Sequence, residues 1–593
     1  MNSQDQKETK PTKQATRRGF LKGAASTVAA TAGMVALPPL LGEKSRAFGQ
    51  ITGSTSTTSS GNNNVSNTPT AFGQQSAQQR AQTAFEIRSN AAQAEFNLPQ
   101  PQQLNNQDEV RFPNFIGNFT KALPHDQFGV VNQTAYQSLL TALKSGSPAD
   151  FENIILGGTM KIGDPQAGLA FDMEGVDSHK VTMPPGPPID SALRAGEMVE
   201  LYWAALARDV PFSQYGKEPI TQATINDLNR LSNFQGPKVN GQVTPQTLFR
   251  GGLAGESVGP AISQFFLMPA QFGALAVNDT NGNPTQMYNV QAPGIDFMKD
   301  VQSFLNVQSG INADPTVPFN LAYGPTPILG PRHLKDGRGL ASFVHVDELY
   351  QAYFMATLNI LDRLQTPFNP GNPYLNYKKQ FPFGTFGNPH AITLVAEVST
   401  RALHAQWYQK WFVHRALRPE SFGGLVEFKI HKNQPFPVHN DVLNSGALQA
   451  ILKNNNGTAL LPTAFPEGCP PFPALGSGHS TVAGACATFI KAFFDEKFVI
   501  PNPVTPSDDG TQLLNYTGSD AGQITILTEA HKIASNVGMG RVHAGVHWRS
   551  DHTEALLLGE AIAISILQDQ RATYNENFQG FTFTKFDGTQ ITV

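Results

Sequence analysis

Apolar residues recur at helical spacing along most of the chain beyond residue 110. One such face, in 480–497, consists of Val482, Cys486, Phe489, Ile490 and Phe493. Similar patterns predict helices over 133–145, 190–208, 346–364, 389–418, 480–497, 524–537 and 552–571. Strand-like alternation is scarce, and we expect one short hairpin in 581–593 that turns at Asp587-Gly588. The pattern therefore predicts a mainly α-helical fold with long loops and minor β-hairpins.

The first hundred residues have a different character. Arg17-Arg18 is followed by a weakly apolar run over 23–41, which resembles a twin-arginine export signal spanning 1–47. That resemblance implies export of the folded protein to the periplasm or the exterior of a prokaryotic cell; the alternative is a basic disordered tail before a membrane anchor. Residues 48–76 are polar and lack periodicity, so we expect a disordered linker.

The Ala- and Gln-rich segment 77–97 is a candidate helix at the entry to the folded part. No repeat of fixed period divides the remaining chain, although its length would allow about four domains. We therefore expect residues 77–593 to form one large helical catalytic domain, without a stable membrane span in the mature protein.

The overall composition excludes some classes of function. The formal net charge is −4 and charged residues make up 15% of the chain, so binding to nucleic acid through a bulk positive field is excluded. Any anion must be held by a few cations at one place. Two cysteines, Cys469 and Cys486, are too few for a disulfide scaffold or a cysteine-ligated iron–sulfur cluster, and sequence alone leaves open whether they pair.

A first candidate motif places Lys410, His414 and Arg418 four residues apart in sequence, so that they share one face if the helix continues through them. Trp407 lies one turn earlier, and Pro419 puts the cations at the helix end. Like charges on one face repel unless an anion lies between them. A solvated basic stripe is the alternative interpretation.

A second candidate is the turn Ser477-Gly478-His479, which leads directly into an apolar helix. Free backbone N–H groups and the positive end of the helix dipole make such a turn an anion site. His479 can exchange protons near neutral pH. An ordinary N-cap formed by Ser477 is equally compatible with the sequence.

A third candidate contains Arg541, His543, His547 and Asp551. Two imidazoles and a carboxylate could bind a divalent cation, although Arg541 weighs against it. Alternatively, Asp551 orients one His through its Nδ1–H, or the histidines are simply buried in a packed helix. Taken together, the three motifs supply three cations, backbone donors and two histidines suited to a tetrahedral oxyanion.

The order Lys…Arg-Pro, Ser-Gly-His, Arg…His…Asp resembles the superfamily of type 2 phosphatidic acid phosphatases, bacterial acid phosphatases and vanadium-dependent haloperoxidases. In this chain the same order of motifs consists of Lys410…Arg418-Pro419, 477–479 and Arg541…His547…Asp551. The long step from Lys410 to Arg418 and the flanking motifs favour the bromoperoxidase branch of algae and cyanobacteria. Bromoperoxidases of that branch commonly carry a second His where this chain has Phe472, which leaves the halide preference open.

The resemblance covers about 77–593 and implies a fold built on four-helix bundles. It also implies a vanadate cofactor whose vanadium is bound by His547 and whose oxygens are held by Lys410, Arg418, Ser477, Gly478 and Arg541. His479 would be the acid–base catalyst, Lys410 would polarise bound peroxide, and Asp551 would orient His547. Trp407 and Phe472 are candidates for the halide pocket, whereas Trp411, His414 and His543 are expected to be structural.

By the same resemblance, the chain would oxidise halide, bromide foremost, with hydrogen peroxide to hypohalous acid, which halogenates small organic substrates. Relatives form homo-oligomers, and some hold a structural calcium ion whose ligands cannot be placed in this chain. The sequence leaves three alternatives: an acid phosphatase acting on phosphomonoesters at the same site, a non-catalytic oxyanion-binding protein, and a divalent metal site at His543, His547 and Asp551.

Overall fold

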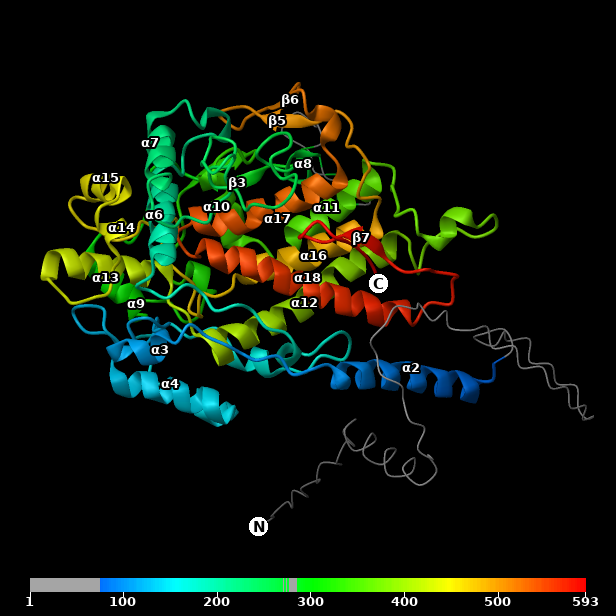
Figure 1. Ribbon diagram of the computed structural model, residues 1–593, viewed down its shortest axis with the longest axis horizontal. Coiled ribbons are helices and arrows are strands. Elements are labelled where there is room, and N and C mark those ends of the chain that lie inside the picture. The colour runs from blue at the N-terminus through cyan, green and yellow to red at the C-terminus, as the bar shows by residue number, and fades with distance from the viewer. Residues whose placement is uncertain (1–74, 270, 273–274, 277–284) are drawn as a thin grey trace, which may run out of the picture. The chain divides into compact units, whose positions relative to one another are not determined.

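A computed structural model describes residues 75–269, 271–272, 275–276 and 285–593 of the 593-residue chain (Figure 1). Residues 75–593 form one compact unit. The export signal expected over 1–47 and all but the last two residues of the expected linker lie outside the described residues. None of the described helices is both long and apolar enough to cross a membrane.

Helices dominate the described part of the chain. The α-helices are α2 (Ala77–Asn97), α3 (Asp108–Arg111), α4 (Gln133–Ser145), α5 (Pro148–Phe151), α6 (Ala192–Leu206), α7 (Pro219–Leu228), α8 (Gln264–Leu267), α9 (Val301–Gln308), α10 (Gly337–Val346), α11 (Gln351–Asp362), α12 (Asn388–Tyr408), α13 (Pro419–Lys432), α14 (Asn440–Leu443), α15 (Gly446–Asn454), α16 (Gly478–Phe493), α17 (Ile526–His543) and α18 (Arg549–Arg571). A π-helical segment, η7 (Gln409–His414), follows α12. The 3₁₀ turns are η1 (Pro113–Phe115), η2 (Pro165–Leu169), η3 (Ser178–Lys180), η4 (Phe212–Gln214), η5 (Phe319–Leu321), η6 (Pro373–Asn376) and η8 (Ala521–Gln523).

Strands occur in the described residues only as antiparallel pairs. These are β1 (Gln271–Phe272) with β2 (Leu275–Ala276), β3 (Tyr288–Gln291) with β4 (Ile328–Arg332), β5 (Val504–Pro506) with β6 (Leu513–Asn515), and β7 (Thr582–Thr584) with β8 (Gln590–Thr592). The last pair is the hairpin expected around Asp587-Gly588. Mainly α structure with minor hairpins is thus confirmed.

Helix α16 is the centre of a bundle with α12, α17 and α18 (Figure 1). Every residue of α16 except His479 is buried, not only the apolar face expected from the sequence. Small residues such as Ala483, Gly484 and Ala487 make this possible, because neighbouring helices can then approach α16 from several sides. The bundle therefore holds the first turn of α16, which carries Ser477, Gly478 and His479, on a rigid support.

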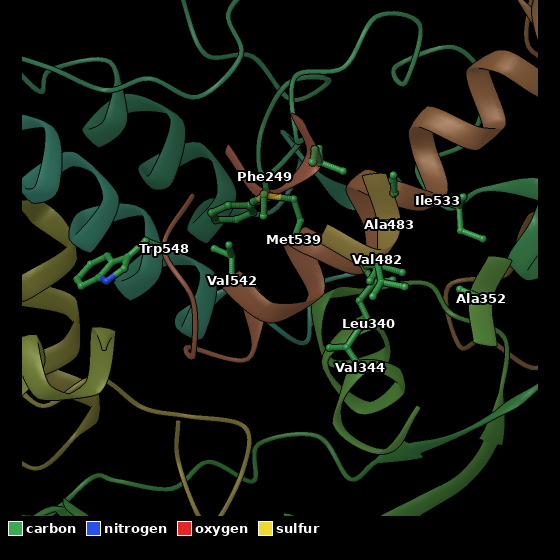
Figure 2. Close-up of a cluster of buried hydrophobic side chains, with 14 of the residues drawn as sticks. Phe249, Leu340, Val344, Ala352, Val482, Ala483, Ile533, Met539, Val542 and Trp548 are labelled. Carbon is green, nitrogen blue, oxygen red and sulfur yellow. The ribbon is translucent and has the colours of Figure 1, made fainter. Parts of the chain in front are cut away.

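Figure 2 shows part of the main hydrophobic core, where side chains from α10, α11, α16 and α17 meet. Its labelled residues are Phe249, Leu340, Val344, Ala352, Val482, Ala483, Ile533, Met539, Val542 and Trp548. All ten are buried. The core thus fastens together the ends of α10 and α17 and the start of α16, three places from which site residues project.

The helix expected over 389–418 is interrupted, which is the largest difference from the sequence interpretation. Helix α12 ends at Tyr408, the π-helical segment follows, and Arg415 takes a left-handed conformation with φ of 43°. Arg418 is extended and precedes Pro419, which begins α13. Proline disfavours helical geometry at the residue before it, so Arg418 cannot continue the helix of Lys410. The shared helical face expected for Lys410, His414 and Arg418 is therefore wrong.

Another predicted helix, 346–364, is also shorter than expected. Helix α10 ends at Val346 and α11 begins only at Gln351. The residues between them, including Asp347, form a loop at the functional site described below. By contrast, the predictions over 77–97 and 133–145 match α2 and α4 at both ends.

Close packing between α16 and α18 depends on glycine. A Cβ atom on Gly559 would lie 1.9 Å from the backbone oxygen of Thr481, so even alanine cannot fit without separating the two helices. We expect Gly559→Ala to reduce the free energy of unfolding by about 3 kcal/mol, as measured by urea denaturation. Gly522→Ala is the matched control, because no heavy atom lies within 4 Å of its added Cβ. Equal stability of the two variants would contradict this account of the interface.

Candidate oxyanion site

The site lies at a cavity of about 750 Å³ in the unit formed by residues 75–593. Its wall includes Trp407, Phe472, Gly478, His479, Arg541 and His547, together with residues of the loop that follows α10. Segments far apart in sequence therefore converge on one space.

Lys410 and Arg418 reach the site from the π-helical segment and from the residue before α13. Lys410 Nζ donates to the backbone oxygens of 473–474 at 2.7 and 3.1 Å. Arg418 Nε donates to the oxygen of Phe472 at 2.8 Å, and its Nη1 donates to that of Val546 at 2.8 Å. Backbone carbonyls thus orient both cations without cancelling their charge.

Arg541 completes the cationic group from the last turn of α17 and donates from Nη1 to the backbone oxygen of Val344. Lys410, Arg418 and Arg541 are all buried, and none makes an ion pair within the described ranges. Arg418 Nη2 and Arg541 Nε are enclosed and have no hydrogen-bond partner there. Three unneutralised buried charges and two unused donors form a strong site for an oxyanion.

Electrostatic strain among these cations is visible in their pKa values. Burial, followed by repulsion from Arg418, lowers the pKa of Lys410 well below its usual value and that of Arg541 to about 10. Burial also lowers the pKa of Arg418. A bound anion would relieve this strain, because it favours the charged form of each side chain.

His547 and Asp551 form an oriented pair beside the cations. His547 Nδ1 lies 2.8 Å from Asp551 Oδ2, while its Nε2 lies 2.9 Å from Arg418 Nη1. A carboxylate at Nδ1 and a guanidinium donor at Nε2 favour the tautomer with its lone pair on Nε2. Burial and then Arg418 lower the pKa of His547 well below 6.5, so the ring is neutral and Nε2 can act as a ligand.

Backbone contacts fix both the side chain and the main chain of Asp551. Its Oδ2 also accepts from the N–H of Trp548 at 3.0 Å, and its backbone oxygen accepts from the N–H of Ser477 at 2.8 Å. Burial raises the pKa of Asp551 to about 6 despite nearby cations, of which Arg194 has the largest effect. Asp551 thus links the histidine to the turn before α16.

Ser477 caps α16, as one interpretation of the sequence required: its hydroxyl accepts from the N–H of Ser480 at 3.3 Å. The cap and the anion site are compatible, because Gly478 and His479 in the same turn line the cavity. The first turn of α16, where the positive end of the helix dipole lies, therefore borders the cavity.

His479 is held by a residue that the sequence analysis missed. Its Nε2 lies 2.8 Å from Oδ1 of Asp347, directly after α10, and the Asp347 side chain is almost fully buried. Burial lowers the pKa of His479, although the charge of Asp347 opposes this shift. No local spacing points to this pair, since 132 residues separate its members.

Two aromatic residues line the cavity beside the cations, as the candidate halide pocket required. The rings of Trp407 and Phe472 lie 4.9 Å apart, and Lys410 Nζ lies 5.2 Å from the centre of the Phe472 ring. The Trp407 indole N–H donates to Asp164 at 3.1 Å. Trp411 instead packs edge-on against Phe119, in the same hydrophobic cluster as Trp407, and does not line the cavity.

The remaining candidates do not reach the site. His414 and His543 are buried with both ring nitrogens unpartnered, in agreement with a structural role. His543 is the last residue of α17, six residues before α18 begins, and it packs on Phe249. In the described ranges no three His, Cys, Asp or Glu side chains are grouped to hold a metal ion, so the divalent site at His543, His547 and Asp551 is wrong.

Both cysteines are buried and free in the structure. Cys469 lies in the loop before α16, whereas Cys486 lies within α16 and contacts the backbone oxygen of Val395. Burial raises the pKa of the Cys469 thiol to about 12, which disfavours the thiolate that a nucleophile requires.

Fold and site together define a helical-bundle protein with a buried cluster of cations suited to an oxyanion and an adjacent histidine held by a carboxylate. Residues 391–576 match the family model described as the VCPO second helical-bundle domain. The chain is 35% identical over 607 residues to a vanadium-dependent bromoperoxidase of Corallina pilulifera, with 87% of this chain and 99% of the relative covered. A vanadium-dependent bromoperoxidase of Ascophyllum nodosum is 32% identical, with coverage of 80% and 86%.

A solved structure shows the same likeness. The homohexameric structure of the second vanadate-dependent bromoperoxidase from Ascophyllum nodosum superposes with a TM-score of 0.80 at 30% identity, and covers 95% of both chains. This chain belongs to the vanadium-dependent bromoperoxidase family. The unneutralised cations and the enclosed unpartnered donors of Arg418 and Arg541 fit the vanadate cofactor of that family.

The low pKa of Lys410 predicts that vanadate binding takes up protons. Burial and Arg418 lower the pKa of Lys410 in the anion-free protein, and a bound anion raises that pKa again, so binding favours the charged side chain. We expect the wild type to take up more protons than Lys410→Gln on binding, and its affinity to fall as the pH rises. Calorimetry of orthovanadate binding in buffers of different ionisation enthalpy measures the difference, and equal proton uptake would contradict it.

Proposed function

We propose that the chain is a vanadate-dependent haloperoxidase. It oxidises halide, bromide foremost, with hydrogen peroxide to hypohalous acid, which then halogenates small organic molecules. The observation that carries this proposal is the group of three buried cations without ion pairs around Nε2 of His547. Family membership at 35% identity over most of the chain supports the same activity.

In this proposal Lys410, Arg418, Ser477, Gly478 and Arg541 hold the oxygens of vanadate, and His547 Nε2 binds the vanadium. When bound, vanadate supplies a Lewis acid that activates peroxide toward the halide. The cations stabilise the negative charge, and they need no reorganisation because backbone carbonyls already orient them.

In this proposal His479 is the residue that transfers protons. Its imidazole, held at Nε2 by Asp347, takes a proton from hydrogen peroxide and returns it to the departing oxygen. The net reaction consumes peroxide, halide and one proton, and gives hypohalous acid and water. Trp407 and Phe472 provide an apolar place for a weakly hydrated halide next to the positive charge of Lys410.

Bromination should depend on vanadate. With hydrogen peroxide and bromide, we expect the purified protein to brominate an organic acceptor only after orthovanadate is added. Phosphate, which has the same tetrahedral shape, should compete with orthovanadate for the site. The assay includes a phosphomonoester, because its hydrolysis without vanadate-dependent bromination would instead support the acid phosphatase.

Removal of the His479 imidazole should separate binding from catalysis. We expect His479→Ala to slow bromide oxidation about 100-fold or more while orthovanadate still binds, since the cations and His547 remain. His404→Ala is the control: His404 also pairs with a carboxylate, Asp172, but lies outside the cavity lining. Activity that survives in His479→Ala would show that the assigned role is wrong.

We also propose export by the twin-arginine route to the periplasm or the cell exterior, with residues 77–593 as the catalytic domain. A homo-oligomeric state is supported by the homohexameric structure of the related bromoperoxidase from Ascophyllum nodosum. The structural calcium ion expected from the resemblance remains without a ligand set, and the described residues supply no metal-binding cluster for it.

Export should require the paired arginines. We expect full-length protein with Arg17→Lys and Arg18→Lys to remain in the cytoplasm of a bacterial host, as measured by fractionation and immunoblotting. Lys7→Gln with Lys10→Gln removes two charges but leaves the pair intact, and this variant should be exported. Export of both variants would contradict the twin-arginine route.

A further inference from the structure

A second histidine–carboxylate pair lies in the cavity wall beside His479. His345 is in the last turn of α10, and Glu467 is in the loop that leads to α16. Nε2 of His345 lies 2.7 Å from Oε1 of Glu467, and the two side chains are 6% and 1% exposed. The proposed oxidation of halide uses neither residue.

The His345 ring is fixed close to the oxyanion site. It stacks on Phe465 with 3.8 Å between ring centres and 6° between planes. The guanidinium carbon of Arg541 lies 5.5 Å from the centre of that same Phe465 ring. One aromatic residue thus connects this pair with a cation of the proposed vanadate site.

The free nitrogen of His345 is available for chemistry. Glu467 occupies Nε2, whereas Nδ1 has no hydrogen-bond partner among the described residues. Unlike both ring nitrogens of His414 and His543, Nδ1 is not enclosed by protein. Because the side chain is almost buried and lines the cavity, the accessible nitrogen lies on the cavity side. With a carboxylate on Nε2–H, Nδ1 is a proton acceptor.

The rest of the wall suits an aromatic ring. Phe319, Leu321 and Phe465 join Trp407 and Phe472 in lining the space. A cavity of about 750 Å³ lies within the range that accommodates small organic ligands of one or two rings. A hydroxyl on such a ring would be the donor that the free nitrogen of His345 lacks.

We infer that His345, positioned by Glu467, is a general base that activates an aromatic alcohol for halogenation inside the cavity. This inference rests on the proposed function, which supplies hypobromous acid. His345 Nδ1 takes the hydroxyl proton, and the ring carbon of the resulting phenolate attacks bromine. The Br–O bond breaks with its electron pair on oxygen, the departing hydroxide takes the proton from His345, and the ring loses its C–H proton to restore the hydroxyl. The products are the bromophenol and water.

Two matched acceptors test the inference with the vanadate-loaded enzyme. 2-Naphthol carries the hydroxyl, and 2-methoxynaphthalene lacks its proton. We measure the ratio of their brominated products when both are present, and compare it with the ratio given by added hypobromous acid. The wild-type enzyme should exceed the reagent ratio about tenfold, because only the hydroxyl can use the base.

The variants His345→Gln and Glu467→Gln should lower the product ratio to that of the reagent while bromide-dependent peroxide consumption stays unchanged. That consumption also reports that each variant is folded and loaded. His404→Gln, which changes a histidine–carboxylate pair outside the cavity lining, should keep the wild-type ratio.

A wild-type product ratio equal to that of added hypobromous acid would overturn the inference. A product ratio in His345→Gln that stays above that of added hypobromous acid would also overturn it. These outcomes leave bromide oxidation intact, so they differ from failure of the proposed function, in which the wild type with vanadate would consume no peroxide with bromide. That last outcome overturns both.

Discussion

Burial of three positive charges that have no carboxylate partner among the described residues is the constraint on which the rest of this structure depends. Each charge loses hydration that an ion pair would ordinarily replace. Here backbone carbonyls accept from Lys410, Arg418 and Arg541, which orients the donors and leaves their charge available. The lowered pKa of Lys410 shows the remaining cost. Such a site is stable only within a rigid frame, and a bound oxyanion would complete it.

The frame is the bundle around α16. Because this helix is buried on every side, its first turn cannot move independently of α12, α17 and α18. The carboxylate of Asp551 holds His547, and its backbone oxygen accepts from the N–H of Ser477, so one residue of α18 links this histidine to the cap of α16. The loop after α10 adds Asp347 in the same way, and fixes His479 at the edge of the cavity. Positions of proton-transfer groups are therefore set by packing across helices rather than along one helix.

Several interpretations of the sequence failed where chain direction changes. Spacing predicts that Lys410 and Arg418 share a helical face, yet Pro419 forces Arg418 out of the helix and the two cations reach the site from different elements. Spacing likewise predicts that His543 and His547 lie one helical turn apart, yet α17 ends at His543, which packs into the core. In both cases the predicted geometry is wrong, because local periodicity does not report where a helix stops.

The sequence by itself determined the helical class and the closing hairpin, and it supplied the candidate residues of the oxyanion site, from Lys410 to Asp551. These follow from local chemistry: apolar spacing, a glycine turn before a helix, and cations that need an anion. Only the tertiary structure decided that Asp347 pairs with His479 and Glu467 with His345, since members of each pair lie more than a hundred residues apart. Folding brings each carboxylate within hydrogen-bond distance of its imidazole, in a place from which water is largely excluded. No spacing along the chain encodes the distance between the two side chains.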